Sequence, residues 1–117
     1  MTLTSPISIY GVDGPEATRI DCGLRSRHFD VQPSAAGSVI SGVLLSSGLG
    51  CVQVSECAAE QVCSAPTGNG GCVHIRASNV VIHDSWLLDC KARGSGGGVF
   101  VQKGTQGIRL EALRIMH

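Results

Sequence analysis

The sequence predicts an all-β fold, a parallel β-helix in which residues 1–117 form one segment. Three observations lead to this prediction. The C-terminal part contains one passage twice, at a nearly constant spacing. Short apolar segments with an alternating pattern are separated by Gly, Ser and Asn, and long helical periodicity is absent. Aromatic residues make up only 3% of the chain, so the expected core is narrow and aliphatic.

The repeated passage consists of a glycine run that opens a strand, followed by a second apolar segment. Gly70 to Ile75 matches Gly96 to Val101 at an offset of 26, and Val80 to Leu87 matches Ile108 to Ile115 at an offset of 28. Such self-similarity is typical of solenoids, in which a coil buries its apolar face only when a neighbour stacks on it. An antiparallel sandwich does not require this constant spacing, so the repeats favour stacked coils.

The N-terminal part contains three predicted strands, at 6–11, 18–23 and 28–32. Each is short and is followed by Gly, Pro or a polar turn cluster. Phe29 and Val31 are two positions apart, so they lie on one face of the third strand. Three strands with turns of this kind fit one full coil.

The segment Val39 to Gly48 repeats the pattern of the later coil at an offset of 42. This alignment predicts two inward columns of side chains, about 4.8 Å apart from coil to coil. The first column is Ile40, Ile82 and Leu110, and the second is Val43, Ser85 and Leu113.

The additional length between these coils is predicted to be a cysteine-containing loop at 49–69. Within it, Glu56 to Val62 has room for about two helical turns, which are marginal alone. The loop residues Cys51, Cys57 and Cys63 recur every six positions and are the first disulfide candidates. A bridge within this loop is favoured, for example Cys57 to Cys63 or Cys51 to Cys63, although six cysteines permit about 15 connectivities.

The remaining cysteines are Cys22, Cys72 and Cys90. Cys22 and Cys90 end their strands in similar contexts, which is also what small stacked core residues would show. Cys72 and Cys90, with His74 and His83, nominally offer a zinc site, but the spacing matches no zinc module. A disulfide or a buried thiol is therefore the expected state of Cys72 and Cys90, and no metal or cofactor is expected.

Composition and charge narrow the partners and the location. Basic and acidic residues number 9 each, so no basic excess indicates nucleic acid. No apolar run of about 18 residues predicts a transmembrane segment, and the first residues do not resemble a signal peptide. Six cysteines nevertheless indicate an oxidising compartment. An internal fragment of an extracellular or cell-surface protein reconciles these features, and its apolar coil ends are expected to self-associate.

Three passages, Ile9 to Cys22, Val39 to Gly48 and Asn79 to Leu87, resemble repeats of the pectin-lyase-like superfamily. They are more similar to cell-surface and polymorphic-outer-membrane-type repeats than to the lyases and polygalacturonases. The enzyme motifs Asn-Thr-Asp, Gly-His-Gly and Arg-Ile-Lys do not occur. The resemblance implies a right-handed parallel β-helix of roughly three to four coils, from a longer array. It also implies a structural or adhesive role, with polysaccharide or a surface protein as the partner.

The alternative function is part of a polysaccharide lyase or glycoside hydrolase. Its acid and base candidates are Asp84 and Asp89, with His83 and Lys91 close in sequence. A lyase needs a base and cations for a uronate, and a hydrolase needs two carboxyl groups across a sugar. The next coil offers neutral Ala112 opposite Asp84, so a solvated face explains these charges equally well. We therefore expect no catalytic activity from this chain.

The glycine run at 94–98 is a poor candidate for a phosphate loop. Such a loop leads into a helix whose N-terminus faces the anion, whereas this run leads into the predicted strand Val99 to Val101. Its glycines are better suited to tight corners between strands.

Overall fold

The computed structural model describes residues 1–24, 26–50, 68–93 and 96–116. These residues form short strands and one 3₁₀ helix, η1 (Pro33–Ala35). In chain order the strands are β1 (Thr2–Leu3), β2 (Ser8–Tyr10), β3 (Arg19–Asp21), β4 (Phe29–Val31), β5 (Val39–Ser41), β6 (Leu44–Ser46), β7 (Val73–Ile75), β8 (Val81–His83), β9 (Trp86–Leu88), β10 (Val99–Val101), β11 (Arg109–Glu111) and β12 (Arg114–Met116).

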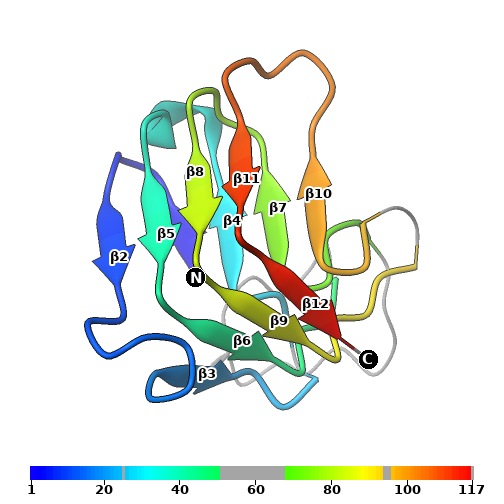
Figure 1. Cartoon of the computed structure of the whole chain (residues 1–117). Coiled ribbons are helices and arrows are strands. Elements are labelled where there is room, and N and C mark those ends of the chain that lie inside the picture. Colours follow the sequence, from blue (N-terminus) through cyan, green and yellow to red (C-terminus); the bar gives the residue numbers. More distant parts are fainter. Residues whose placement is uncertain (25, 51–67, 94–95, 117) are drawn as a thin grey trace.

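The strands build three parallel sheets of four strands each. Sheet A has the order β1-β4-β7-β10, sheet B the order β2-β5-β8-β11, and sheet C the order β3-β6-β9-β12. The chain thus passes from A to B to C four times, and we call each passage a coil (Figure 1). Every strand pairs in parallel with its counterpart on the neighbouring coil, which is consistent with a parallel β-helix.

The strand registers reproduce the offsets that the sequence repeats predict. Val73 pairs with Val99, as the offset between the two glycine-opened strands requires. Ile82 pairs with Leu110 on one side and with Ile40 on the other, as the two offsets of the second segment require. The stacking derived from the repeats is therefore confirmed for these coils.

The core is a narrow stack of aliphatic side chains between the three sheets. In sheets B and C the middle residue of each inner strand points inward, and Ile40, Ile82, Leu45 and Leu87 are fully buried. The first inward column, Ile40, Ile82 and Leu110, follows directly from the register.

The second predicted column lies at the corner between sheets B and C. Val43 and Ser85 are buried, and Leu113 packs against the core. The N–H of Trp86 donates to Val43 O, and the N–H of Arg114 donates to Ser85 O, so these positions stack on successive coils. The second column is also confirmed.

The corner between sheets B and C needs one residue in the left-handed region on each later coil. Gly42, Asp84 and Ala112 have φ values of 70°, 49° and 50°. A left-handed residue reverses the side-chain direction within a short turn, which lets the chain change sheets without a loop. At Gly42 a side chain would also collide with the carbonyl oxygen of Gly11, so glycine is required there.

The structure adds two features to those that the sequence predicts, strand β1 and the base of the loop. Strand β1 was not predicted, because two residues are too short to show alternation. The loop predicted at 49–69 has a described base: the N–H of Gly68 donates to Gly50 O at 2.9 Å, and Gly50 N donates to Lys91 O at 2.8 Å. The chain therefore leaves and re-enters the stack at one place. The helix predicted at Glu56 to Val62 lies outside the described residues.

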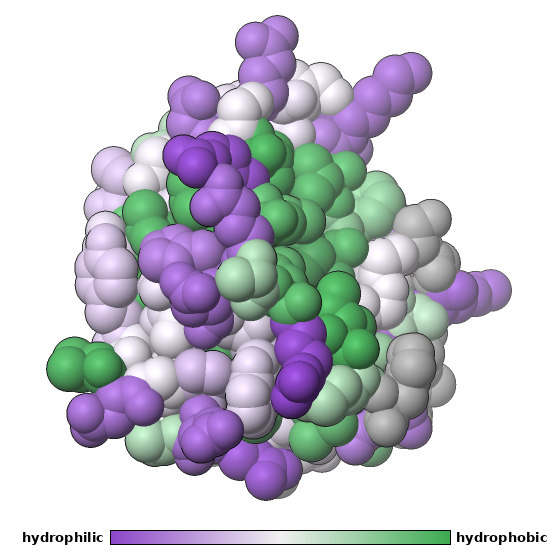
Figure 2. Space-filling view, in the orientation of Figure 1, coloured by the Kyte–Doolittle hydropathy of each residue, from purple (hydrophilic) through white to green (hydrophobic). Residues whose placement is uncertain are grey.

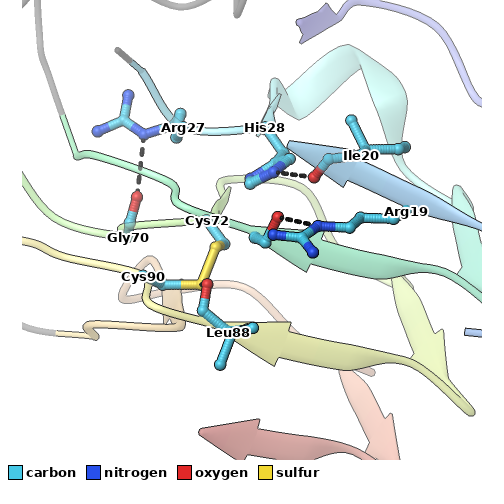
Figure 3. Close-up of a disulfide and its surroundings, with 9 residues drawn as sticks. Arg19, Ile20, Arg27, His28, Gly70, Cys72, Leu88 and Cys90 are labelled. Carbon is cyan, nitrogen blue, oxygen red and sulfur yellow. Dashed lines mark hydrogen bonds between the residues drawn. A yellow bond between two sulfur atoms is a disulfide. The ribbon is translucent and has the colours of Figure 1, made fainter. Parts of the chain in front are cut away.

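A disulfide joins Cys72 to Cys90, with 5.3 Å between their Cα atoms (Figure 3). Cys72 precedes β7 and Cys90 follows β9, so the bond joins the beginning and the end of one coil. The disulfide expected as one state of Cys72 and Cys90 is therefore present. Cys22 is also disulfide-bonded, so Cys22 and Cys90 are buried, as small core residues would be, but the interpretation that they are no more than stacked core residues is wrong. The suggested bridges among Cys51, Cys57 and Cys63 lie outside the described residues.

Candidate functional site

The outer face of sheet A carries a cluster of polar and aromatic side chains. In this sheet the first and last residues of β4 and β7 point into the core, so the middle residues point outward. Asp30, His74 and Phe100 therefore form one outward column in register. Gln32, Arg76 and Gln102 follow the three strands, and their backbone hydrogen bonds continue the same register.

Asp30 lies between two guanidinium groups. Arg76 Nε is 3.2 Å from Asp30 Oδ1, and Arg27 Nη1 is 4.0 Å from Asp30 Oδ2. In the described part of the chain neither Arg76 Nε nor Asp30 Oδ1 makes a hydrogen bond, so the shorter contact is an ion pair with poor alignment. One carboxylate shared by two guanidinium groups leaves one positive charge uncompensated within this cluster.

Arg27 is a buried side chain with a structural task. Only 3% of its surface is exposed, and it donates from Nη2 to Asn69 O at 2.7 Å. Its Nε also donates to Gly70 O at 3.3 Å (Figure 3). Burial lowers the pKa of Arg27, the carboxylate of Asp30 opposes this shift, and Arg76 adds to it. Arg27 thus fixes the backbone of residues 69–70, where the chain returns from the loop, beside sheet A.

His74 is packed between an aromatic ring and an amide. Its ring meets the ring of Phe100 edge to face, with 5.0 Å between centroids, and its Nε2 lies 3.2 Å from Gln102 Oε1. The amide oxygen accepts, so Nε2 carries the proton and Nδ1 is an acceptor. Nδ1 is buried and has no hydrogen-bond partner among the described residues.

The environment keeps His74 neutral at physiological pH. Burial lowers its pKa most, and Arg76 and Arg27 lower it further, against the opposing effects of Gln102 and Asp30. A neutral imidazole is suited to act as a base, but its unpaired nitrogen is buried, and the neighbouring carboxylate of Asp30 is paired with arginines. The sheet A cluster therefore offers no exposed base among the described residues.

The acid and base candidates predicted from the sequence lie elsewhere, on sheets B and C. His83 ends β8, and its Nδ1 is 2.6 Å from Asp84 Oδ2 and 3.3 Å from Ser41 Oγ. Asp84 occupies the left-handed corner, with Gly42 and Ala112 at the same position on neighbouring coils. The structure thus brings His83 and Asp84 together, and Glu111 of the next coil is in register with His83, whereas the position of Asp84 itself has only Gly42 and Ala112 on the neighbouring coils.

Asp89 and Lys91 lie beyond the other end of β9. The chain from Asp84 to Asp89 includes an extended strand, which separates the two carboxylates by roughly 15 Å at about 3.3 Å per residue. Lys91 pairs with Leu49 of the preceding coil, an apolar residue. The candidates of this coil therefore do not converge on one point.

The nominal zinc set is not assembled. Cys72 and Cys90 are joined in a disulfide, and His74 and His83 lie on different sheets. No cluster of three or more metal-binding side chains occurs within the ranges that the structure describes.

The sheet A cluster was missed by sequence reasoning, although the sequence contains a signal for it. Phe29-Asp30-Val31 and Val73-His74-Ile75 share the pattern apolar, polar, apolar, and the loop inserted between them hides the equivalence. Aligning the two passages directly would have placed Asp30 beside His74.

No protein-family model, curated protein or solved structure matches this chain.

Proposed function

We propose that this chain is a structural or adhesive segment of an extracellular or cell-surface right-handed β-helix, and that it binds a glycan on the outer face of sheet A. The resemblance to pectin-lyase-like repeats and the parallel stacking of the strands support the architecture. The Cys72–Cys90 disulfide is compatible with an oxidising, extracellular location. No helix in the described part of the chain is long and apolar enough to cross a bilayer.

The observation that carries the glycan proposal is the strip formed by Gln32, Arg76 and Gln102. These three side chains occupy the same position on three successive coils, beside the half-buried ring of Phe100. An amide group donates hydrogen bonds to hydroxyl groups and accepts them, a guanidinium group donates them, and an aromatic ring packs on the apolar face of a sugar. Coils about 4.8 Å apart match the length of one sugar ring in a chain. A polysaccharide lying across the coils would therefore meet one polar group per sugar unit.

The strip can be tested with a panel of immobilised polysaccharides and Gln102→Ala. Gln102 is exposed, so its truncation is expected to weaken binding severalfold. Because the substitution also removes the hydrogen-bond acceptor of His74 Nε2, thermal melting checks the fold of the variant. Gln106→Ala is the matched control, because Gln106 is an exposed glutamine in the same connection but outside the strip. Equal effects of the two substitutions, or the absence of saturable binding to any polysaccharide, would contradict the glycan site.

The enzymatic alternative is favoured by one observation, the neutral His74 beside Asp30 and two arginines. Its test is incubation with pectin, polygalacturonate, alginate and chondroitin, with and without calcium. Unsaturated products are followed by ultraviolet absorbance, and hydrolysis is followed by the release of reducing ends. We expect no turnover. Activity lost in Asp84→Asn or Asp89→Asn would support the candidates from the sequence, and activity lost in His74→Gln would support the sheet A cluster.

A further inference from the structure

The outer face of sheet C is apolar where a solvent-facing strand surface would normally be polar. Its inward residues are those of the core column that contains Leu45 and Leu87, so the flanking residues face outward. On β6, β9 and β12 these outward side chains include several apolar ones that are only partly buried. We define the Trp86 face as Leu44, Trp86, Leu88, Arg114 and Met116. Parallel sheets seldom leave such a face uncovered, and an exposed apolar patch often marks an interaction site.

The guanidinium group of Arg114 lies over the ring of Trp86, the only tryptophan of the chain. Leu44, Trp86 and Arg114 are paired in register on successive coils. The guanidinium carbon of Arg114 lies 5.1 Å from the centre of the Trp86 ring. Cation–π stacking of this kind restrains the long side chain and leaves the N–H groups at the guanidinium edge free to donate.

Arg114 lacks the carboxylate that its counterparts have. On β3, Arg19 is 3.3 Å from Asp21, two positions later on the same outer face. On β11, Arg109 Nε is 2.9 Å from Glu111, again two positions later. The residue two positions after Arg114 is Met116, and among the described residues Arg114 makes no ion pair. The Trp86 face therefore contains an arginine that is restrained by the tryptophan ring and has no carboxylate partner among the described residues. Aliphatic side chains surround this arginine.

From this combination we infer that the Trp86 face docks a protein segment that presents one carboxylate between aliphatic side chains. The carboxylate would accept two N–H bonds from Arg114, and the aliphatic groups would cover Leu44, Leu88 and Met116. Trp, Met and Arg are the residue types that protein interfaces enrich. A sugar ring is a poorer occupant, since the guanidinium already covers the indole and the neighbouring side chains offer no hydrogen bonds. The docking site lies on a different sheet from the glycan strip and is independent of it.

The sole tryptophan makes the inference directly measurable. The probes are six-residue peptides with capped ends, in which one Asp stands among leucines, and matched peptides with Asn in place of Asp. We expect the acidic peptides to change the fluorescence of Trp86 saturably and the Asn peptides to bind about tenfold more weakly. Polygalacturonate is the third probe and supplies carboxylates without aliphatic side chains.

Substitutions separate the docking site from a general effect of charge. Arg114→Gln is expected to abolish the difference between Asp and Asn peptides, and Arg114→Lys to reduce it, because lysine lacks the planar fork. Arg109→Gln is the matched control on the same coil and is expected to change nothing. Thermal melting of each variant checks the fold. Equal affinity for Asp and Asn peptides, no saturable response to any peptide, or a response to polygalacturonate alone would overturn the inference.

Discussion

His28 is a buried titratable group with a single described side-chain hydrogen bond. Its Nε2 donates to Ile20 O at 2.7 Å, as Figure 3 shows, and its Nδ1 has no partner among the described residues. Burial lowers the pKa of His28 from 6.5 to about 4, and the hydrogen bond to Ile20 opposes this shift only in part. The folded protein therefore holds His28 neutral in a range where the unfolded chain binds a proton.

This difference predicts a loss of stability in acid. As the pH falls from about 6.5 to about 4, the unfolded state is protonated first, so the free energy of unfolding decreases. A shift of this size corresponds to about 3 kcal/mol, lost progressively over that window and not further below it. The burial of His74 acts in the same direction. Urea unfolding followed by circular dichroism at pH 7.5, 6, 5 and 4 measures the effect.

The control is His28→Gln, which keeps an N–H donor for Ile20 O and removes the titration. We expect this variant to be somewhat less stable at pH 7.5 but to lose less stability between pH 6.5 and pH 4. A wild-type protein and a variant with parallel pH profiles would show that His28 does not cause the acid sensitivity.

Residue-level prediction from the sequence succeeded where a local pattern decides the environment. The inward positions Ile40 and Ile82 follow from alternation within one strand and from the repeat offset. The role of His28 depends on a carbonyl from β3, and that of Asp30 depends on Arg76 of the next coil. Partners brought together by stacking across a long loop leave no local pattern, so these roles needed the structure.

At the scale of the structural elements, the column Ile40, Ile82 and Leu110 allows a buried position to be compared with a partly exposed one. Ile82 is fully buried between two coils, whereas Leu110 lies on the last described coil and is 44% exposed. Ile82→Ala is expected to lower the free energy of unfolding by about 3 kcal/mol, because it leaves a cavity in a packed core. Leu110→Ala is expected to cost about 1 kcal/mol or less, since its side chain is only partly removed from water.

Denaturant unfolding of the two alanine variants measures this difference. Ile82→Asp is expected to prevent folding, since an unpaired buried carboxylate costs several kcal/mol. Similar losses of unfolding free energy for Ile82→Ala and Leu110→Ala would contradict the predicted effect of burial.

Strand positions could be predicted better than corners and connections. The glycine-opened strands β7 and β10 and the paired segments β8 and β11 lie where the repeats place them. The left-handed corner was hidden because its residues differ, being Gly42, Asp84 and Ala112. These three positions share a backbone conformation but not a residue type, so comparing the sequences of the coils does not reveal the corner. The sequence pattern therefore predicts Asp84 only as an acid candidate, and the structure adds that Asp84 occupies the left-handed corner.

For the whole molecule, the last described coil leaves an apolar surface exposed. Figure 2 shows a continuous hydrophobic area beside β11 and β12, and the residues of this coil include Leu110 and Ile115, which are 44% and 54% exposed. Val99, Val101 and Ile108 are only partly covered. The predicted self-association of coil ends therefore has a defined surface in this chain.

We expect the purified chain to associate as its concentration rises, because contact between two such surfaces removes apolar area from water. Light scattering coupled to gel filtration measures this. Ile115→Lys is expected to shift the molecule toward the monomer, since it places a charge in the contact. Val12→Lys is the matched control, because Val12 is 93% exposed on a turn away from this surface. A monomer at every concentration would contradict the prediction.

The Cys72–Cys90 disulfide gives one coil a different response to mechanical load. Because the bond joins the two ends of the circuit through β7, β8 and β9, tension along the chain passes through the sulfur atoms and bypasses those strands. The chain between the two cysteines, a sequence separation of 18, cannot lengthen, which withholds about 60 Å of extended chain. The following coil, β10 to β12, is able to peel away under force, whereas this coil persists as a closed ring until a reductant opens it.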